Sequence, residues 1–82
     1  THLRIVRYST GHLQGRHPLA LQRGMRFCAC LIAIERAGTI WIDFPPDFTL
    51  GADDTLYVCG GRDDLKTLQA AFALQAVHSS SH

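Results

Sequence analysis

The order of apolar and polar positions along the chain predicts four short strands and two helices. Strands are expected at residues 3–8, 27–34, 39–42 and 55–59, and a short helix at residues 18–23. A final helix follows the last strand, because Leu65, Leu68 and Phe72 recur at helical spacing. The segment from Phe27 to Ile34 is apolar without alternation, which is typical of a central strand buried on both faces. The resulting order β-α-β-β-β-α predicts an α+β fold: a small mixed β-sheet with the helices packed on one face.

Turn and capping residues mark the ends of these elements. Ala37-Gly38 is a two-residue turn, so the strands on either side of it are expected to form a hairpin. Pro18 suits the first position of a short helix, where its missing N–H costs nothing. Asp63 and Asp64 fall in the first turn of the last helix, where we expect them to cap free N–H groups.

Length and composition indicate one small globular unit. The chain has 82 residues, 46% of them apolar and 18% charged, against roughly 150 residues for an average domain. We expect residues 1–76 to form the domain and residues 77–82 to be a disordered tail or the remnant of a tag. Because the chain opens on Thr1, we interpret it as a segment of a longer protein. Its longest apolar run has eight residues, whereas a membrane-spanning helix needs about 20, so direct membrane insertion is not expected.

Charge is unevenly distributed along the chain. Residues 1–36 contain six Arg and one Glu, a net charge of +5, whereas residues 37–82 contain Arg62, Lys66 and six Asp, a net charge of −4. The arginines are dispersed and lack interleaved aromatic residues, so we do not expect nucleic acid as a partner.

The three cysteines, Cys28, Cys30 and Cys59, do not form a disulfide framework because their number is odd. Free thiols favour a reducing compartment, hence the cytoplasm. Cys-x-Cys also lacks the ligand spacing of a zinc knuckle. We therefore expect all three to be small residues of the core, since free cysteine is among the most buried residue types.

The motifs of common enzymes and metal sites are absent from the sequence. It contains no Gly-x-Gly-x-x-Gly, P-loop or His-Glu-x-x-His pattern. His12 and His17 flank a glycine loop and are interpreted as exposed loop residues, with ligand contact as the alternative. The acidic pairs 53–54 and 63–64 are explained by a turn and a helix cap rather than by a cation. We expect no catalytic residue and no metal site, and so no enzyme.

Four segments together are similar to a known family. They are Leu13-Gln14-Gly15-Arg16-His17-Pro18-Leu19, Leu31-Ile32-Ala33-Ile34-Glu35-Arg36-Ala37-Gly38, Pro46-Asp47-Phe48-Thr49-Leu50, and Asp54-Thr55-Leu56-Tyr57-Val58-Cys59-Gly60 followed by Leu65. In order and spacing they resemble the C-terminal subdomain of the regulator of potassium conductance, also called the TrkA C-terminal domain. The resemblance covers roughly residues 3–75. Asp53 departs from it, because the family usually has Gly before the residue that corresponds to Asp54.

The resemblance implies a regulatory domain of a potassium channel or potassium transport system. Such a domain lies at the cytoplasmic face of the membrane, follows a Rossmann-like nucleotide-binding domain, forms a homodimer and couples binding of a small ligand to gating. The same module on an antiporter, a permease or a transcription regulator is an alternative. A dimerisation module without a ligand is another.

The resemblance also implies a ligand site. Some members of the family bind cyclic di-AMP at positions that match Ala29, Cys30, Leu31 and Pro46, although those binders tend to carry Asn where this chain has Cys30. Arg23 and Arg26 precede the central strand, and a guanidinium is well shaped to hold a phosphate. We therefore predict a small anionic or nucleotide-like ligand, a cyclic dinucleotide among the candidates, and no other cofactor. The predicted site comprises Arg23, Arg26, Ala29, Cys30, Leu31 and Pro46.

Overall fold

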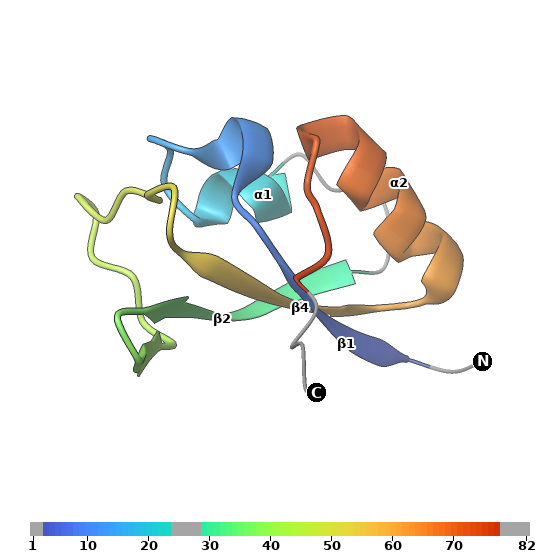
Figure 1. Cartoon of the computed structure of the whole chain (residues 1–82), viewed down its shortest axis with the longest axis horizontal. Coiled ribbons are helices and arrows are strands. Elements are labelled where there is room, and N and C mark those ends of the chain that lie inside the picture. Colours follow the sequence, from blue (N-terminus) through green and yellow to red (C-terminus); the bar gives the residue numbers. More distant parts are fainter. Residues whose placement is uncertain (1–2, 24–28, 78–82) are drawn as a thin grey trace.

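The part of the chain that the structure describes folds as one four-stranded sheet with two helices on the same side of it (Figure 1). The computed structural model describes residues 3–23 and 29–77. Its elements are β1 (Arg4–Tyr8), a 3-10 turn η1 (Gly11–Leu13), α1 (Leu19–Arg23), β2 (Ala29–Arg36), β3 (Thr39–Trp41), β4 (Thr55–Gly60) and α2 (Arg62–Phe72). This confirms the α+β class and the predicted order of the elements.

The sheet is antiparallel between all neighbouring strands, and the prediction of a mixed sheet is wrong. The strand order is β1-β4-β2-β3. Both β1 and β2 pair antiparallel with β4, which lies between them. They therefore run in the same direction without touching, as the helical connection from β1 to β2 requires. The insertion of the last strand between the first two removes the parallel contact that a mixed sheet would contain.

The hairpin of β2 and β3 forms around the predicted turn. Arg36 pairs with Thr39, and the two residues between them both have positive φ, 51° at Ala37 and 80° at Gly38. Positive φ at both central positions is the geometry of a type I′ turn, whose twist matches that of the strands. The hairpin prediction is thus confirmed, although β3 ends at Trp41, one residue earlier than expected.

The hydrophobic core lies between the sheet and the two helices. Its fully buried side chains are Leu13, Leu21, Ile34, Leu56, Val58 and Leu68.

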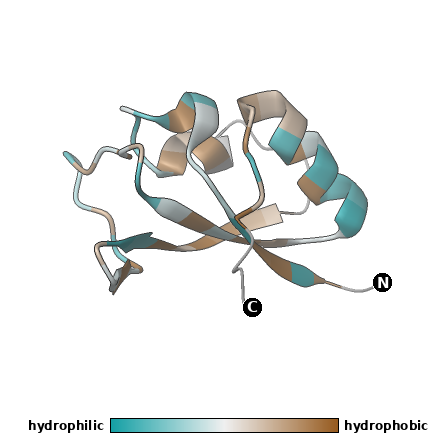
Figure 2. Cartoon of the chain, viewed as in Figure 1, coloured by the Kyte–Doolittle hydropathy of each residue, from teal (hydrophilic) through white to brown (hydrophobic). Residues whose placement is uncertain are grey.

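Figure 2 shows the first half of α2 as mostly hydrophilic, in keeping with its exposed Arg62, Asp63 and Lys66. The two acidic residues of the first turn do not cap α2 as predicted, because its N-cap residue is Gly61 and no side chain there accepts from the helix N–H groups.

Neither α1 nor α2 lies over the opposite face of the sheet, and this corrects two predictions. On β2, Leu31 and Ile34 are buried whereas Cys30 and Ile32 are exposed, so this strand is covered on one face only. The register shifts between Leu31 and Ala33, so Ile32 interrupts the regular alternation. Cys30 is exposed and Cys59 is half-buried, so the prediction that these two are core residues is wrong; Cys28 lies outside the described residues.

The segment after α2 returns along β1. The N–H of Ser9 donates to the carbonyl of Gln75 at 2.8 Å, and the N–H of Val77 donates to the carbonyl of Arg7 at 2.8 Å. The contacts of the domain thus extend to residue 77, the first residue of the predicted tail at 77–82, and residues 78–82 of that tail lie outside the described residues. Within the described ranges, no helix is both long and apolar enough to span a bilayer.

Candidate functional site

The structure separates the residues that the sequence predicted as one site. Ala29 and Leu31 lie at the start of β2 opposite the end of β4, and Leu31 belongs to the core. Cys30 lies between them on the open face of the sheet. Pro46 follows β3. It lines a hollow of about 380 Å³ together with His17, Leu19 and Phe44. Arg26 and the side chain of Arg23 lie outside the described residues.

His17 attaches the loop after β3 to the start of α1. Its Nε2 lies 2.9 Å from the carbonyl oxygen of Pro45, and its Nδ1 accepts from the N–H of Leu19 at 3.1 Å. This pair of contacts fits the tautomer that carries its proton on Nε2. The ring of Phe44 also meets the imidazole edge-on. The interpretation of His17 as an exposed loop residue is therefore wrong, because the ring is half-buried and satisfied within the chain.

The carboxylate of Asp54 forms an ion pair with the guanidinium of Arg36. Its two carboxylate oxygens accept from Nε and Nη2 of Arg36 at 2.9 and 2.5 Å, and one of them also accepts from the N–H of Gly51 at 2.8 Å. The hydrogen bonds from Arg36 hold the pKa of Asp54 below its usual value, against the opposing effect of burial. No group of three or more metal-ligating side chains occurs in the part of the chain that the structure describes.

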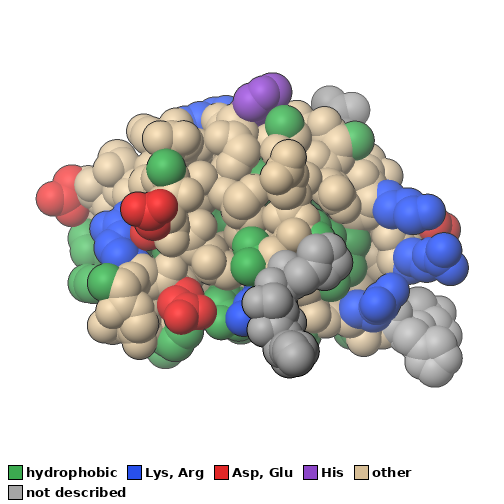
Figure 3. All heavy atoms as spheres, viewed as in Figure 1, with side chains coloured by type: hydrophobic (Ala, Val, Ile, Leu, Met, Phe, Trp, Pro, Cys, Tyr) green, Lys and Arg blue, Asp and Glu red, His purple; other side chains and the backbone are tan. Residues whose placement is uncertain are grey.

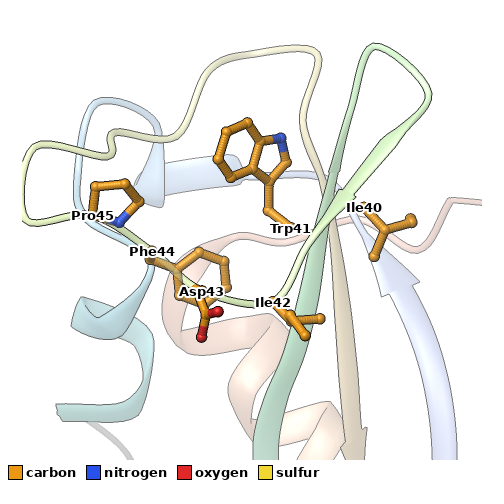
Figure 4. Close-up of a pocket in the computed structure, with 6 residues that line it drawn as sticks. All are labelled: Ile40, Trp41, Ile42, Asp43, Phe44 and Pro45. Carbon is orange, nitrogen blue, oxygen red and sulfur yellow. The ribbon is translucent and has the colours of Figure 1, made fainter.

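A second hollow, of about 600 Å³, lies beside the free edge of β3 and is lined by residues 40–45 (Figure 4). Ile40 and Ile42 point to one side of the chain there, and Trp41 points to the other, where its ring meets that of Phe48 at 5.5 Å. Asp43 is the single charged residue of this lining. The hollow offers apolar contact but no set of polar groups that would orient a ligand.

The third hollow, which we name the basic groove, lies between β1 and α2 and has a volume of about 360 Å³. Its lining residues are Arg4, Val6, Tyr8, Arg62, Leu65, Lys66, Gln69, Ala76 and Val77. Three of these carry a positive charge, and the others provide an apolar floor with a few polar groups. Figure 3 shows Lys and Arg side chains gathered at the end of the molecule where α2 begins.

Tyr8 is a buried residue of the groove lining. Burial raises the pKa of Tyr8 above its ordinary value of 10.0, and the positive charge of Arg4 opposes that rise only in part. The phenol therefore keeps its proton at neutral pH and remains a hydrogen-bond donor. The groove thus combines fixed positive charge with a neutral donor.

The basic groove was missed at the level of sequence because its cations come from distant positions. Arg62 and Lys66 are one helical turn apart and share a face of α2, which their spacing alone indicates. Arg4 joins them because β1 pairs with β4, so that Arg4 lies opposite Gly60, two residues before Arg62. Ala29 also pairs with Gly60, from the other side. Ala29, one residue of the predicted anion site, and the basic groove therefore lie at the same end of the sheet, but on different elements.

Comparison with known proteins adds no relative. No protein-family model matches the chain, and no curated protein matches its sequence significantly. The class of this domain therefore rests on its α+β fold and on the chemistry of the basic groove.

Proposed function

We propose that this chain is a non-catalytic, ligand-sensing regulatory domain and that its ligand is a small molecule bearing phosphate. The observation that carries the proposal is the convergence of Arg4, Arg62 and Lys66 on one groove with an apolar floor. Arg36, outside the groove, is neutralised by an ion pair with Asp54. Among the described residues, no ion pair joins Arg4, Arg62 or Lys66 to a carboxylate. These three charges are therefore available to an anion.

The groove suits a nucleotide better than a simple anion. Guanidinium groups bind phosphate through paired N–H donors, and Lys66 adds a point charge. The N-terminus of α2, where Arg62 begins the helix, contributes a positive dipole end. Val6 and Leu65 supply apolar surface for a base or a ribose, and Gln69 supplies an amide for its polar edge.

The wider role is proposed from the resemblance to the TrkA C-terminal domain. On that basis the domain serves a potassium channel or a potassium transport system, at the cytoplasmic face of the membrane and next to a Rossmann-like domain. A ligand that binds one arrangement of a homodimer more tightly than another shifts the balance between them, and so gates the parent protein without catalysis. The same module on an antiporter, a permease or a transcription regulator would use the groove in the same way.

Isothermal calorimetry tests the ligand proposal directly. AMP, ATP, cyclic di-AMP and inorganic phosphate are titrated into the wild-type chain and into Arg62→Gln. At least one nucleotide should bind, and the substitution should weaken it by about tenfold to a hundredfold, which corresponds to one charge-assisted hydrogen bond of about 1.5–3 kcal/mol.

Arg16→Gln is the matched control, because Arg16 is exposed and lies outside the groove. It removes the same charge and should leave the affinity unchanged. The proposal fails if none of the nucleotides binds, or if Arg16→Gln and Arg62→Gln weaken binding equally, since the second result would indicate general charge attraction.

A dimerisation module without a ligand is the second candidate, and the open face of the sheet favours it. Ile5, Ile32 and Ile40 are 65%, 41% and 52% exposed there. Sedimentation equilibrium at tens of micromolar should give about twice the chain mass of 9.1 kDa, because burying such side chains stabilises a pair. A dimer that binds no nucleotide would favour this candidate over ligand sensing, and a monomer would exclude homodimerisation at that concentration.

A further inference from the structure

Two cysteines lie directly opposite each other on the open face of the sheet. Cys30 of β2 pairs with Cys59 of β4 in the antiparallel register, between the pairs Ala29–Gly60 and Leu31–Val58. Residues that are opposite in a sheet project their side chains to the same face. The two thiols therefore share one face, and Ile5 of β1 is the next residue in the same row.

The register places the two backbones within the range that a disulfide spans. Directly opposed residues in antiparallel strands have Cα atoms about 4.5–5.5 Å apart, and disulfides bridge Cα atoms about 4.4–6.8 Å apart. Both side chains are thiols in the structure. Closing the bond thus requires rotation of side chains rather than movement of strands.

Both cysteines also have surface that solvent reaches. Cys30 is exposed and Cys59 is half-buried, and neither α1 nor α2 covers this face (Figure 1). Their neighbour Ile5 is 65% exposed, so it does not cover them. A thiol that lies within reach of both solvent and a second thiol meets the steric requirement for exchange with a small disulfide.

We propose that Cys30 and Cys59 form a redox-active dithiol, which closes reversibly to an intrachain disulfide when it meets a small disulfide oxidant of the glutathione type. The proposal concerns the open face and is independent of the function proposed for the basic groove, which lies on the helix side of the sheet. The proposal makes Cys30 and Cys59 a site of reversible modification rather than residues that serve only in packing.

The reaction balances in two exchange steps. The thiolate of one cysteine attacks a sulfur of glutathione disulfide, which breaks its S–S bond and releases one glutathione thiolate. The thiolate of the second cysteine then attacks the protein sulfur of this mixed disulfide and releases the second glutathione. The two protein thiols are oxidised by two electrons, one glutathione disulfide is reduced to two thiols, and the two protons pass to the glutathione thiolates.

A disulfide between Cys30 and Cys59 would join the two central strands covalently. The bond joins β2 to β4 next to the row in which Ala29 and Arg4 flank Gly60, at the end of the sheet where α2 begins. It encloses the whole connection from β2 through β3 to β4. Oxidation therefore restricts opening between these two strands, and reduction restores it.

Peptide mapping after oxidation tests the proposal. The wild-type chain and Cys28→Ser are equilibrated with mixtures of reduced and oxidised glutathione, their remaining thiols are alkylated, and both are cut with trypsin. Cleavage after Arg26, Arg36 and Arg62 places Cys28 and Cys30 in the peptide 27–36 and Cys59 in the peptide 37–62. We expect the two peptides to be joined in both proteins, with the chain still monomeric in a denaturing gel without reductant.

Three variants and one further measurement separate the outcomes. Cys30→Ser and Cys59→Ser should lose the linkage and carry glutathione on the remaining member of the pair, whereas Cys28→Ser should keep the linkage. Fragmentation of the linked wild-type peptides locates the bond at residue 30 or 28 without relying on any variant. A bond from Cys28, separate glutathione adducts on Cys30 and Cys59 without closure, or linkage only between chains would each overturn the proposal.

Discussion

Removal of the Asp54 carboxylate is expected to cause a large loss of stability, because three donors converge on it. The Asp54 side chain is 4% exposed and accepts two hydrogen bonds from Arg36 and one from the N–H of Gly51. Asp54→Ala removes the two oxygens that accept these three hydrogen bonds and leaves the guanidinium without its counter-charge. Asp47→Ala is the matched control, because Asp47 is exposed and its removal leaves the Arg36–Asp54 ion pair intact.

The magnitude follows from the exposure of the partner. Breaking a fully buried ion pair costs about 3–5 kcal/mol. The side chain of Arg36 is 38% exposed, so water replaces part of the lost interaction. Arg36 also keeps the carbonyl of Thr49 and its position 4.3 Å above the ring of Phe48. We therefore expect a loss of about 2–3 kcal/mol, which for a domain of this size lowers Tm by roughly 10–20 °C.

The pH dependence gives an independent test of the same pair. The pKa of Asp54 is lowered in the folded state, first by its hydrogen bond from Arg36. The folded state consequently binds fewer protons, and the stabilisation is present above the ordinary value of 3.8 and is lost as the pH falls below it towards the folded pKa. Wild type should lose more stability than Asp54→Ala between pH 5 and pH 2.

Urea unfolding followed by the fluorescence of Trp41 measures both effects. Trp41 is the single tryptophan of the chain and contacts Phe48, which also lies under Arg36. The reasoning is refuted if Asp54→Ala and Asp47→Ala lose equal stability at pH 7, or if the acid dependence of Asp54→Ala matches that of wild type.

Two positions with positive φ, Ala37 and Gly11, give further predictions with opposite signs. Ala37→Gly should raise the free energy of unfolding in urea by about 0.5–1 kcal/mol, because Ala37 has a φ of 51° that glycine adopts without strain. The control Ala52→Gly, in a loop without positive φ, should bring no gain. Gly11→Ala should lower the free energy of unfolding by about 1–3 kcal/mol, because a Cβ there would lie 2.5 Å from the carbonyl oxygens of Phe72 and Ala73. Gly15→Ala is the comparison, because a Cβ at Gly15 would meet open space; an equal loss in the two variants would contradict the prediction.

Local patterns predicted the elements well, because the signals that define them lie within a few residues. The positive φ at Ala37 and Gly38 follows from a turn that the sequence itself displays. The amphipathic face of α2 follows in the same way from Leu65 and Leu68, both buried. Such features depend on spacing and need no knowledge of distant contacts.

The pairing of distant strands was not predictable by the same means. Nothing in the neighbourhood of Arg4 indicates that it lies opposite Gly60, yet this pairing creates the basic groove. An apolar run such as 27–34 also does not reveal whether one or both of its faces are covered. Both helices lie on one side of the sheet, so Cys30 and Ile32 are exposed although their sequence context resembles that of a core strand.

The position of β4 in the sheet has a consequence for the order of folding. β4 is the last strand in the sequence, yet it pairs with both β1 and β2, and β1 has no other strand partner among the described residues. Until residues 55–60 are in place, the hairpin of β2 and β3 is the one strand pair that a growing or collapsing chain can form. Long-range pairing of this kind slows folding, because the entropy of loop closure is lost before the contacts form. During synthesis, β1 therefore has no sheet partner until nearly the whole domain has emerged.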